Sequence, residues 1–320
     1  MTKAYTLKPS APLELYRGSV NAWECDENHH MNVRFFASRA LEGLGFLAAA
    51  IDMPRAFQAE ATSTLQTMDM HVRFLREARQ GAPLSMRGGV VAMDEFTVTT
   101  FQELRHGDGT PSATFVMRLA HVDPATLKPF AWPSRVRRHA QAVMCAIPSH
   151  GAARSIDTSA QATSPTCAFA DALGAQIVGR LMVTPDHCDA FGRMRMEVFL
   201  GRVSDSVPNL LGRWRDDAAK AAADADGVPR TAGGAVLEYR LAPQRWPRAG
   251  DLLEVRSGVV EVTEKTNRLV HWLFDPVTGD AWCTAEAVAV TFDLITRKTI
   301  AIPEGRRKAL ESHIVTGMTI

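Results

Sequence analysis

An internal repeat constrains the fold of this chain more than any other feature of its sequence. Three segments of the first half recur in the same order in the second half: 25–31 as 188–194, 81–84 as 250–253, and 121–133 as 291–303. The offset is 163 residues for the first pair (189 − 26), 169 for the second (250 − 81) and 170 for the third (293 − 123). It grows by only seven residues (170 − 163), which one loop accommodates. The repeat therefore predicts two copies of one structural module in tandem.

Each copy is expected to contain one long helix followed by antiparallel strands. In the first copy, apolar residues recur at helical spacing as far as Ile51, at Phe36, Ala40, Leu44 and Leu47. Strand-like runs are expected at 16–23, 64–75, 84–93, 96–105 and 112–122. In the second copy, a helix is expected over 196–220, interrupted at Pro208. A helix followed by strands that tight turns connect predicts an α+β fold.

The segment between the copies, residues 134–170, differs from both in composition. Arg135, Arg137 and Arg138 make its beginning basic, and the tract 149–166 is rich in Ala, Ser and Thr and lacks aromatic residues. This composition is typical of a linker, here with a short helix around 136–144. We therefore predict an N-terminal module over 1–140, a linker over 141–170 and a C-terminal module over 171–320.

The overall charge gives no reason to expect a nucleic acid or an anionic membrane as a partner. Lys plus Arg number 36 and Asp plus Glu number 35, for a net charge of +1. No apolar stretch reaches membrane-spanning length, and the first 17 residues lack the apolar segment of a secretory signal. The five cysteines are odd in number and scattered, which does not fit a disulfide framework. A reduced, cytoplasmic protein is therefore expected.

The candidate site is the polar segment that precedes the first long helix. Its sequence is Asp26-Glu27-Asn28-His29-His30-Met31-Asn32. Asn32 is a suitable N-cap, so the segment brings an acid and an imidazole to a helix start. Unbonded backbone N–H groups and the helix dipole favour negative charge there, and an oxyanion could bind at the N–H of Val33.

A metal centre is the rival interpretation of the same residues. Cys25, Asp26, His29 and His30 are all ligand types, but their spacing matches no structural zinc pattern, which joins separated pairs of Cys or His. We therefore expect a site without a metal ion and without a cofactor.

The segment 26–32 resembles the active-site loop of hotdog-fold acyl thioesterases, in the form D-x-N-x-H-[VM]-N of plant and bacterial acyl-ACP thioesterases. The resemblance extends over nearly the whole chain twice, including module ends of the type V-x-[VF]-D-x-x-[TK]-[GR]-K. It implies two hotdog modules, each an antiparallel sheet wrapped around a long helix, paired as an intrachain pseudo-dimer. It also implies hydrolysis of acyl-CoA or acyl-ACP thioesters without a metal or redox cofactor. A homo-oligomer of the double unit is compatible with it.

The resemblance assigns roles to the loop residues. Asp26 would act as general base or as nucleophile, and the sequence leaves both open. His30 would orient the water or the carboxylate, or donate a proton. Asn28 and Asn32 would hold the water or the loop, and Asn32 could instead simply cap the helix.

The sequence departs from the family pattern at several positions. His29 stands where many relatives have Gly. The second copy keeps Asp189 but has Arg193 in place of His30 and Arg195 in place of Asn32. We therefore expect one working site, with the second copy contributing at most Asp189 and Glu197. In plant relatives with two modules the complete motif lies in the second module, whereas here it lies in the first.

Two other functions remain as alternatives. Hotdog enoyl-CoA hydratases carry D-x-N-P-x-H, with the His five residues after the Asp, whereas His30 follows Asp26 by four residues with no intervening Pro. A non-catalytic acyl-CoA binder would leave the Asp–His pair unused. The basic cluster 135–138 could meet the phosphates of coenzyme A or an acidic carrier protein. The acyl group itself is not predicted by the sequence.

Overall fold

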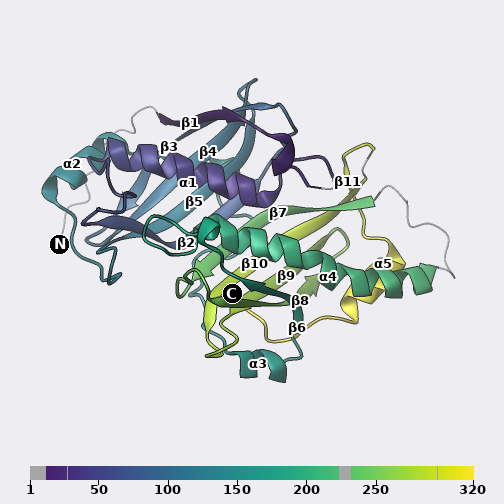
Figure 1. Ribbon diagram of the computed structural model, residues 1–320. Helices are drawn as coiled ribbons and strands as arrows, with labels where there is room; N and C mark the ends of the chain where they lie inside the picture. Colours follow the sequence, from purple (N-terminus) through teal and green to yellow (C-terminus); the bar gives the residue numbers. More distant parts are fainter. Residues whose placement is uncertain (1–11, 27, 223–231, 294) are drawn as a thin grey trace. The chain divides into compact units, whose positions relative to one another are not determined.

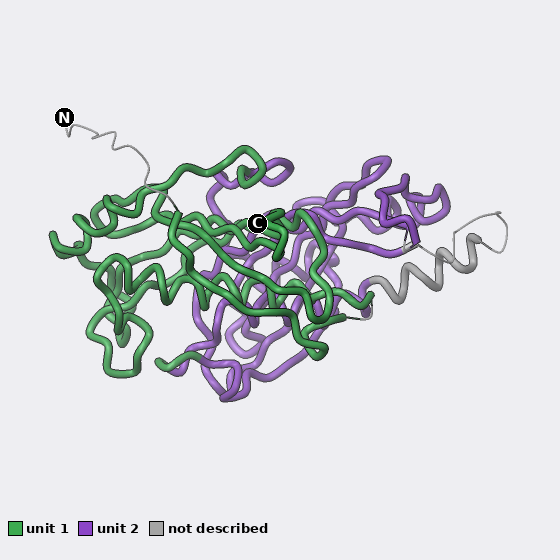
Figure 2. Tube along the Cα trace, turned by 90° about the horizontal axis from the view of Figure 1, so that it is seen from above, with its two compact units in different colours: residues 1–152, 189–191 green, residues 153–188, 192–320 purple. Residues whose placement is uncertain are grey.

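The computed structural model of the protein describes residues 12–26, 28–222, 232–293 and 295–320 (Figure 1). Within them, the chain divides into two compact units (Figure 2). Unit 1 comprises residues up to 152 together with 189–191, and unit 2 comprises 153–188 and 192–320. No helix in the described part of the chain is long and apolar enough to cross a membrane.

Unit 1 is a five-stranded antiparallel sheet with one long helix against it. Its strands are β1 (Leu13–Ser19), β2 (Thr64–Phe74), β3 (Pro83–Met93), β4 (Thr97–His106) and β5 (Pro111–Val122). They are ordered β1-β3-β4-β5-β2. Helix α1 (Val33–Ala50) packs against β1, β3 and β4, as Figure 1 shows. The packing is close at Gly43, where a Cβ would lie 2.8 Å from Met86 Sδ.

Unit 2 has the same organisation. Its strands are β6 (Gln176–Met182), β7 (Ala232–Pro243), β8 (Leu252–Val262), β9 (Thr266–Phe274) and β10 (Ala281–Asp293), ordered β7-β10-β9-β8-β6, with the short β11 (Thr299–Ile300) on β10. The long helix α4 (Met196–Ala222) packs against β6 and β8. The interruption expected at Pro208 is wrong, because α4 continues through it. The neighbouring Ser206 and Asn209 hold this part of α4 to β6: a Cβ on Gly179 would lie 2.2 Å from Ser206 Oγ, and Asn209 Nδ2 donates to Val178 O at 2.7 Å.

Four β-bulges recur between the units at the offsets found in the sequence. The pairing of β1 skips Leu15 and that of β6 skips Val178, 163 residues later (178 − 15). The other bulges fall at Val91 and Val260 (260 − 91 = 169), at Met68 and Leu237 (237 − 68 = 169), and at Ser112 and Trp282 (282 − 112 = 170). A bulge changes the twist of its strand and is not a chance irregularity. The five main strands and the long helix of one unit are therefore structural copies of those of the other.

The segment between the copies begins with α2 (Ser134–Ala142), which is the short helix expected around 136–144. The segment then continues along the sheet of unit 1. Val90 exchanges backbone hydrogen bonds with Val143 and Cys145, and Arg73 Nη1 donates to the carbonyls of His150 (2.8 Å) and Ala152 (3.1 Å).

In unit 2, charged side chains of β7 hold the next part of this segment. Glu238 accepts hydrogen bonds from the backbone N–H groups of Arg154 (2.9 Å) and Ser155 (2.8 Å). Arg240 donates to the carbonyls of Asp157 (2.9 Å) and Ala160 (2.8 Å). Although its composition is that of a linker, the segment follows a defined path along the strands.

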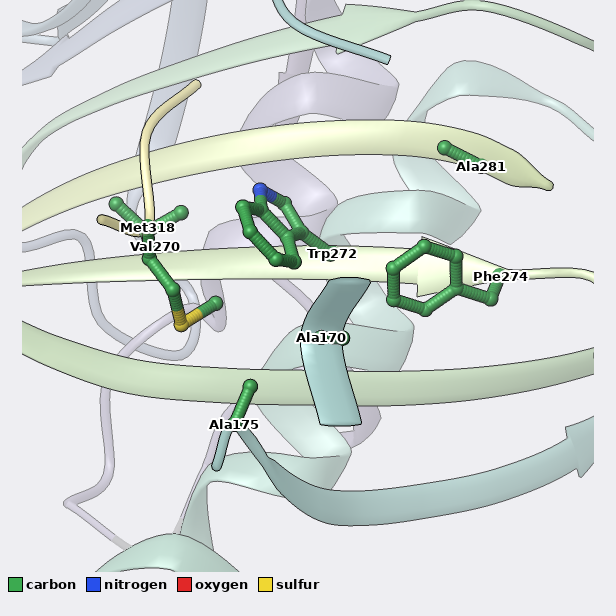
Figure 3. Close-up of a cluster of buried hydrophobic side chains, with 7 residues drawn as sticks. All are labelled: Ala170, Ala175, Val270, Trp272, Phe274, Ala281 and Met318. Carbon is green, nitrogen blue, oxygen red and sulfur yellow. The ribbon is translucent and has the colours of Figure 1, made fainter. Parts of the chain in front are cut away.

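The outer face of the unit 2 sheet carries an apolar cluster that is covered by segments of the same unit (Figure 3). Trp272 and Phe274 of β9 pack there with Ala170 of the short helix α3 (Cys167–Ala172) and with Met318 near the C-terminus. Trp272 Nε1 also donates a hydrogen bond to Thr319 O at 2.8 Å. Helix α5 (Glu304–Glu311) precedes this C-terminal segment.

Candidate functional site

The predicted loop connects a 3₁₀ turn, η1 (Ala22–Glu24), to the start of α1. An isolated antiparallel bridge between Cys25 and Met31 closes it. Inside the bridge, the Asp26 N–H donates to His30 O and the His29 N–H donates to Asp26 O, both at 3.0 Å. Met31 N–H donates to Ala78 O at 2.7 Å, which ties the loop to the segment after β2. Backbone hydrogen bonds thus join the two ends of the loop to each other and to the segment after β2.

The loop brings Asp26 and His30 together, as the sequence predicted. Asp26 Oδ1 accepts a hydrogen bond from the Asn28 N–H at 2.9 Å, and Asp26 Oδ2 lies 3.5 Å from His30 Nδ1. The two side chains are only 18% and 13% exposed, so an interaction between them is little screened by solvent.

Glu77 is a site neighbour that the sequence did not reveal. Its Oε1 lies 3.8 Å from His30 Nε2, so the imidazole stands between the carboxylates of Asp26 and Glu77. Glu77 belongs to the segment after β2 and matches no motif. Glu77 precedes Ala78, whose carbonyl accepts a hydrogen bond from the Met31 N–H. This contact places Glu77 at the loop, and it is seen only in the folded structure.

Asn32 forms the N-cap of α1. Its side chain accepts a hydrogen bond from the Arg34 N–H at 3.0 Å, and its carbonyl accepts from the Phe35 N–H at 2.9 Å. No described residue accepts a hydrogen bond from the Val33 N–H. The first helical residue therefore presents the kind of N–H group to which an anion or a polarised carbonyl can bind.

His29 occupies a left-handed conformation with φ of 62°. Its counterpart in the second copy, 163 residues later (192 − 29), is Gly192, with φ of 73°. Glycine adopts this region without steric cost, whereas another residue pays about 1 kcal/mol or more. The departure from the family pattern at position 29 therefore leaves the backbone path unchanged.

A buried ion pair lies behind the loop. The carboxylate of Glu24 contacts the guanidinium of Arg39 on α1, and the two residues are 4% and 8% exposed. Glu24 Oε2 also accepts from the Asn21 N–H at 2.9 Å, and its carbonyl accepts from the Asn32 N–H at 2.8 Å. Arg39 also pairs with Glu42 at 2.8 Å. Glu24 thus connects both ends of the loop to α1.

The second copy keeps the loop backbone and its Cys, Asp and Met, as Cys188, Asp189 and Met194, and replaces the other side chains. A bridge joins Cys188 to Met194, Asp189 Oδ1 accepts from the Phe191 N–H at 2.8 Å, and the Met194 N–H donates to Pro247 O at 2.7 Å. Each of these repeats a contact of the first loop.

The chemistry of the second loop is nevertheless different. Arg193, which replaces His30, is 3% exposed. Arg195, which replaces Asn32, has no acceptor atom with which to cap a helix, and its Nε lies 2.9 Å from Glu197 Oε1. Glu197, one of the two residues predicted as a possible contribution, is 4% exposed and engaged in this ion pair.

Two hollows in unit 1, of about 430 and 300 Å³, have no lining residue from the loop. Both are lined by residues of β3 and β4, with further lining residues from β1 in the larger and from residues 145–150 in the smaller. Among the described residues, no three His, Cys, Asp or Glu side chains are grouped so as to hold a metal ion.

Comparison with known proteins assigns the family. The model of the thioesterase-like superfamily matches residues 20–139 and 183–310, which is more than half of the chain. The chain belongs to this superfamily. The two matched segments coincide with the two copies, so the predicted resemblance and the predicted thioester-hydrolase class are confirmed at the level of the family.

Solved structures share the fold at low sequence identity. A putative oleoyl thioesterase from Lactobacillus plantarum is 11% identical with a TM-score of 0.63, and the match covers 86% of this chain and 95% of that one. An acyl-ACP thioesterase from Bacteroides thetaiotaomicron is 14% identical with a TM-score of 0.60, covering 86% and 96%. A 12:0-ACP thioesterase from Umbellularia californica is 10% identical with a TM-score of 0.63, covering 88% and 94%.

These matches extend over both copies in each case, and they confirm the α+β class and the two hotdog modules. Comparison with curated proteins by sequence finds no match.

Proposed function

We propose that this thioesterase-like protein hydrolyses acyl-CoA or acyl-ACP thioesters at the loop of unit 1. The observation that carries the proposal is the contact between Asp26 Oδ2 and His30 Nδ1, 3.5 Å apart, just before a helix start whose Val33 N–H has no described acceptor. An acid, a proton carrier and an anion-binding N–H are the three elements that acyl transfer requires. Solved structures named as thioesterases share the fold, which supports thioester hydrolysis as the reaction.

In the proposed reaction, the thioester carbonyl oxygen lies at the Val33 N–H, where the helix dipole stabilises the charge that develops on it. Asp26 either removes a proton from the attacking water or attacks the carbonyl carbon itself; in the second case the acyl group is left on the Asp26 carboxylate as an anhydride, which a water molecule then hydrolyses to the free acid. The tetrahedral intermediate then collapses, the carbon–sulfur bond breaks, and the thiolate takes up a proton. His30, placed between Asp26 and Glu77, is suited to deliver that proton.

Asn28 and Asn32 hold the loop in this proposal. Asn28 fixes the Asp26 carboxylate through its backbone N–H, and Asn32 caps α1 so that the Val33 N–H is oriented towards the substrate. Asp189 and Glu197 are assigned no catalytic step, because Arg193 and Arg195 take the places of the His and the Asn there.

We further propose the module boundaries 1–140 and 171–320, with 141–170 as the connection. Cytoplasmic location is proposed from the cysteines, because none of the five described ones is in a disulfide, which suits a reducing compartment: Cys25, Cys145, Cys167, Cys188 and Cys283.

The test compares Asp26→Asn with Asp189→Asn. The first is expected to lower kcat/KM for acyl-CoA substrates by about a hundredfold or more, because it removes the group that activates the nucleophile. The second should leave kcat/KM nearly unchanged. Circular dichroism of both variants controls for folding, and equal losses in the two variants would contradict the assignment to the first loop.

The same assay separates the alternative functions. Hydrolysis releases a free thiol, which a thiol reagent detects, whereas hydration of an enoyl-CoA removes its absorbance and leaves the thioester intact. Loss of absorbance without thiol would identify a hydratase. A raised Tm with acyl-CoA and no turnover of either kind would identify a binding protein.

A further inference from the structure

The larger hollow of unit 1 is a candidate binding site that the proposed reaction does not use. Its volume is about 430 Å³, within the range of small-molecule sites. Arg17 of β1, Ser85 and Arg87 of β3, and Arg105 of β4 line it. The smaller hollow shares Arg87 and Arg105 with it.

Sheet register places these side chains on one face. Ser85 pairs with Arg17 on one side and with Arg105 on the other, and directly opposed residues point to the same face of a sheet. The next residue along β3, Met86, points to α1, so this row lies on the opposite face, away from the helix. With strands about 4.8 Å apart, the Cα atoms of the two arginines are about 10 Å apart, with the Ser85 hydroxyl between them.

A second row adds Arg87, which pairs across the strands with Glu14 and Glu103. Both carboxylates are engaged by other groups. Glu14 receives hydrogen bonds from Arg17 at 2.9 and 2.7 Å, and Glu103 contacts Arg105 and His150. Three arginines and two glutamates leave one positive charge in excess.

The arginines differ in how readily they could bind a ligand. No hydrogen bond or ion pair joins Arg87 to a described residue, and its side chain is exposed. The Arg17–Glu14 ion pair is open to solvent, with side chains 73% and 43% exposed. Breaking it so that Arg17 can bind a ligand therefore loses little free energy. Arg105 forms an ion pair with the buried Glu103, which is 4% exposed, so its side chain is held in place at one side of the hollow.

We propose that this hollow binds a phosphate-bearing small molecule through Arg17, Arg87 and Arg105, with Ser85 as an additional donor. Guanidinium groups bind phosphate oxygens in pairs of parallel hydrogen bonds, and several arginines converging on one hollow favour a ligand with more than one phosphate oxygen to offer. The nucleotide end of coenzyme A and a free phosphate or diphosphate share this chemistry. The inference rests on the arginines and does not depend on thioester hydrolysis at Asp26.

The hollow thus differs in place from the basic cluster 135–138, which the sequence suggested for a phosphate contact. In that cluster, Arg135 forms an ion pair with Asp52 at 2.7 Å. By contrast, Arg17, Arg87 and Arg105 on the sheet line a hollow in which a ligand could bind.

The experiment is isothermal titration calorimetry of the full chain with two probes, the 3′-phosphorylated adenosine diphosphate of coenzyme A and inorganic pyrophosphate. Arg17→Gln and Arg87→Gln are each expected to weaken binding about tenfold, since each removes charge-assisted hydrogen bonds. Arg118→Gln is the matched control: this exposed arginine lies on β5 of the same sheet and lines neither hollow.

The two probes distinguish the sources. Tighter binding of the nucleotide would show that the site recognises a ligand that contains a nucleotide, such as coenzyme A. Equal binding of both probes would show that it recognises the diphosphate alone. Either result supports the site if both arginine variants weaken binding and the control does not. Absence of binding by both probes, or binding unaffected by the two variants, would overturn the inference. Thiol release assayed in the same variants reports separately on the function proposed for Asp26.

Discussion

Replacing Arg39 by Met is expected to lower the free energy of unfolding of unit 1 by about 4 kcal/mol. The change removes one partner of a buried ion pair, because the side chains of Arg39 and Glu24 are 10% and 5% exposed. Leaving a buried carboxylate without its partner costs about 3–5 kcal/mol. Loss of the Arg39–Glu42 ion pair adds little to this free-energy cost, since Glu42 is 47% exposed. The stacking of Arg39 over the Tyr16 ring, 5.4 Å from its centroid, adds about 0.5–1 kcal/mol.

Urea unfolding followed by tryptophan fluorescence measures this loss, and Trp23, beside Glu24 and 76% exposed, reports on the loop. Glu42→Gln removes only the exposed arm of the network and should cost less than about 1 kcal/mol. The double variant Glu24→Gln/Arg39→Met should recover part of the loss, because no buried charge is then left without a partner. A loss below about 1 kcal/mol in Arg39→Met, or a double variant no more stable than the single one, would refute this account of the pair.

Three further changes test other parts of the structure. Burial lowers the pKa of His271 from 6.5 to about 3, so below pH 6.5 the unfolded chain binds a proton that the folded chain does not. As the pH decreases between these values, the free energy of unfolding should therefore fall by up to about 1.4 kcal/mol per pH unit. Urea titrations at several pH values measure this dependence. His271→Gln should make the free energy of unfolding depend less on pH, whereas His139→Gln, which changes an exposed histidine, should not. In thermal unfolding, Gly192→Ala should cost about 1 kcal/mol while His29→Gly leaves stability unchanged or higher; the opposite order would contradict the left-handed assignment. Pro208→Ala restores the N–H that proline lacks inside α4, so the free energy of unfolding should rise by about 1–3 kcal/mol and Tm should rise with it. An unchanged Tm would show that Pro208 does not destabilise α4.

Features encoded by neighbouring residues were predicted well from the sequence. The start of α1 at Val33 follows from the Asn32 cap and from the apolar spacing behind it, which are local signals. The first strand shows how such signals compete. It was expected at 16–23 and lies at Leu13–Ser19, because Asn21 and Glu24 form a capping box that folds residues 22–24 into a 3₁₀ turn.

Features that depend on distant partners could not be predicted. The path of residues 153–160 is set by Glu238 and Arg240, about 80 positions along the chain, and the composition of the segment carries no trace of them. Glu77 joins His30 only because β2 ends beside the loop. Met68 and Met70 both lie on β2, two residues apart, yet the bulge turns Met68 outward, to 42% exposure, while Met70 is fully buried. Each of these depends on a pairing register that the sequence does not express locally.

The second loop has a consequence for how this protein could evolve. Its shape resides in main-chain hydrogen bonds, in the Asp189 carboxylate and in one glycine, so its other side chains can change without the loop losing its path. After a duplication, one copy can therefore abandon its chemistry while still folding, and selection is then free to act on the two copies separately. Asp189 is still present, and the two loops differ at five of their seven positions, which in the second loop are 190, 191, 192, 193 and 195. Under the proposal of a single working site, the second loop keeps the backbone path and the acid from which a second centre could be regained by side-chain substitution alone.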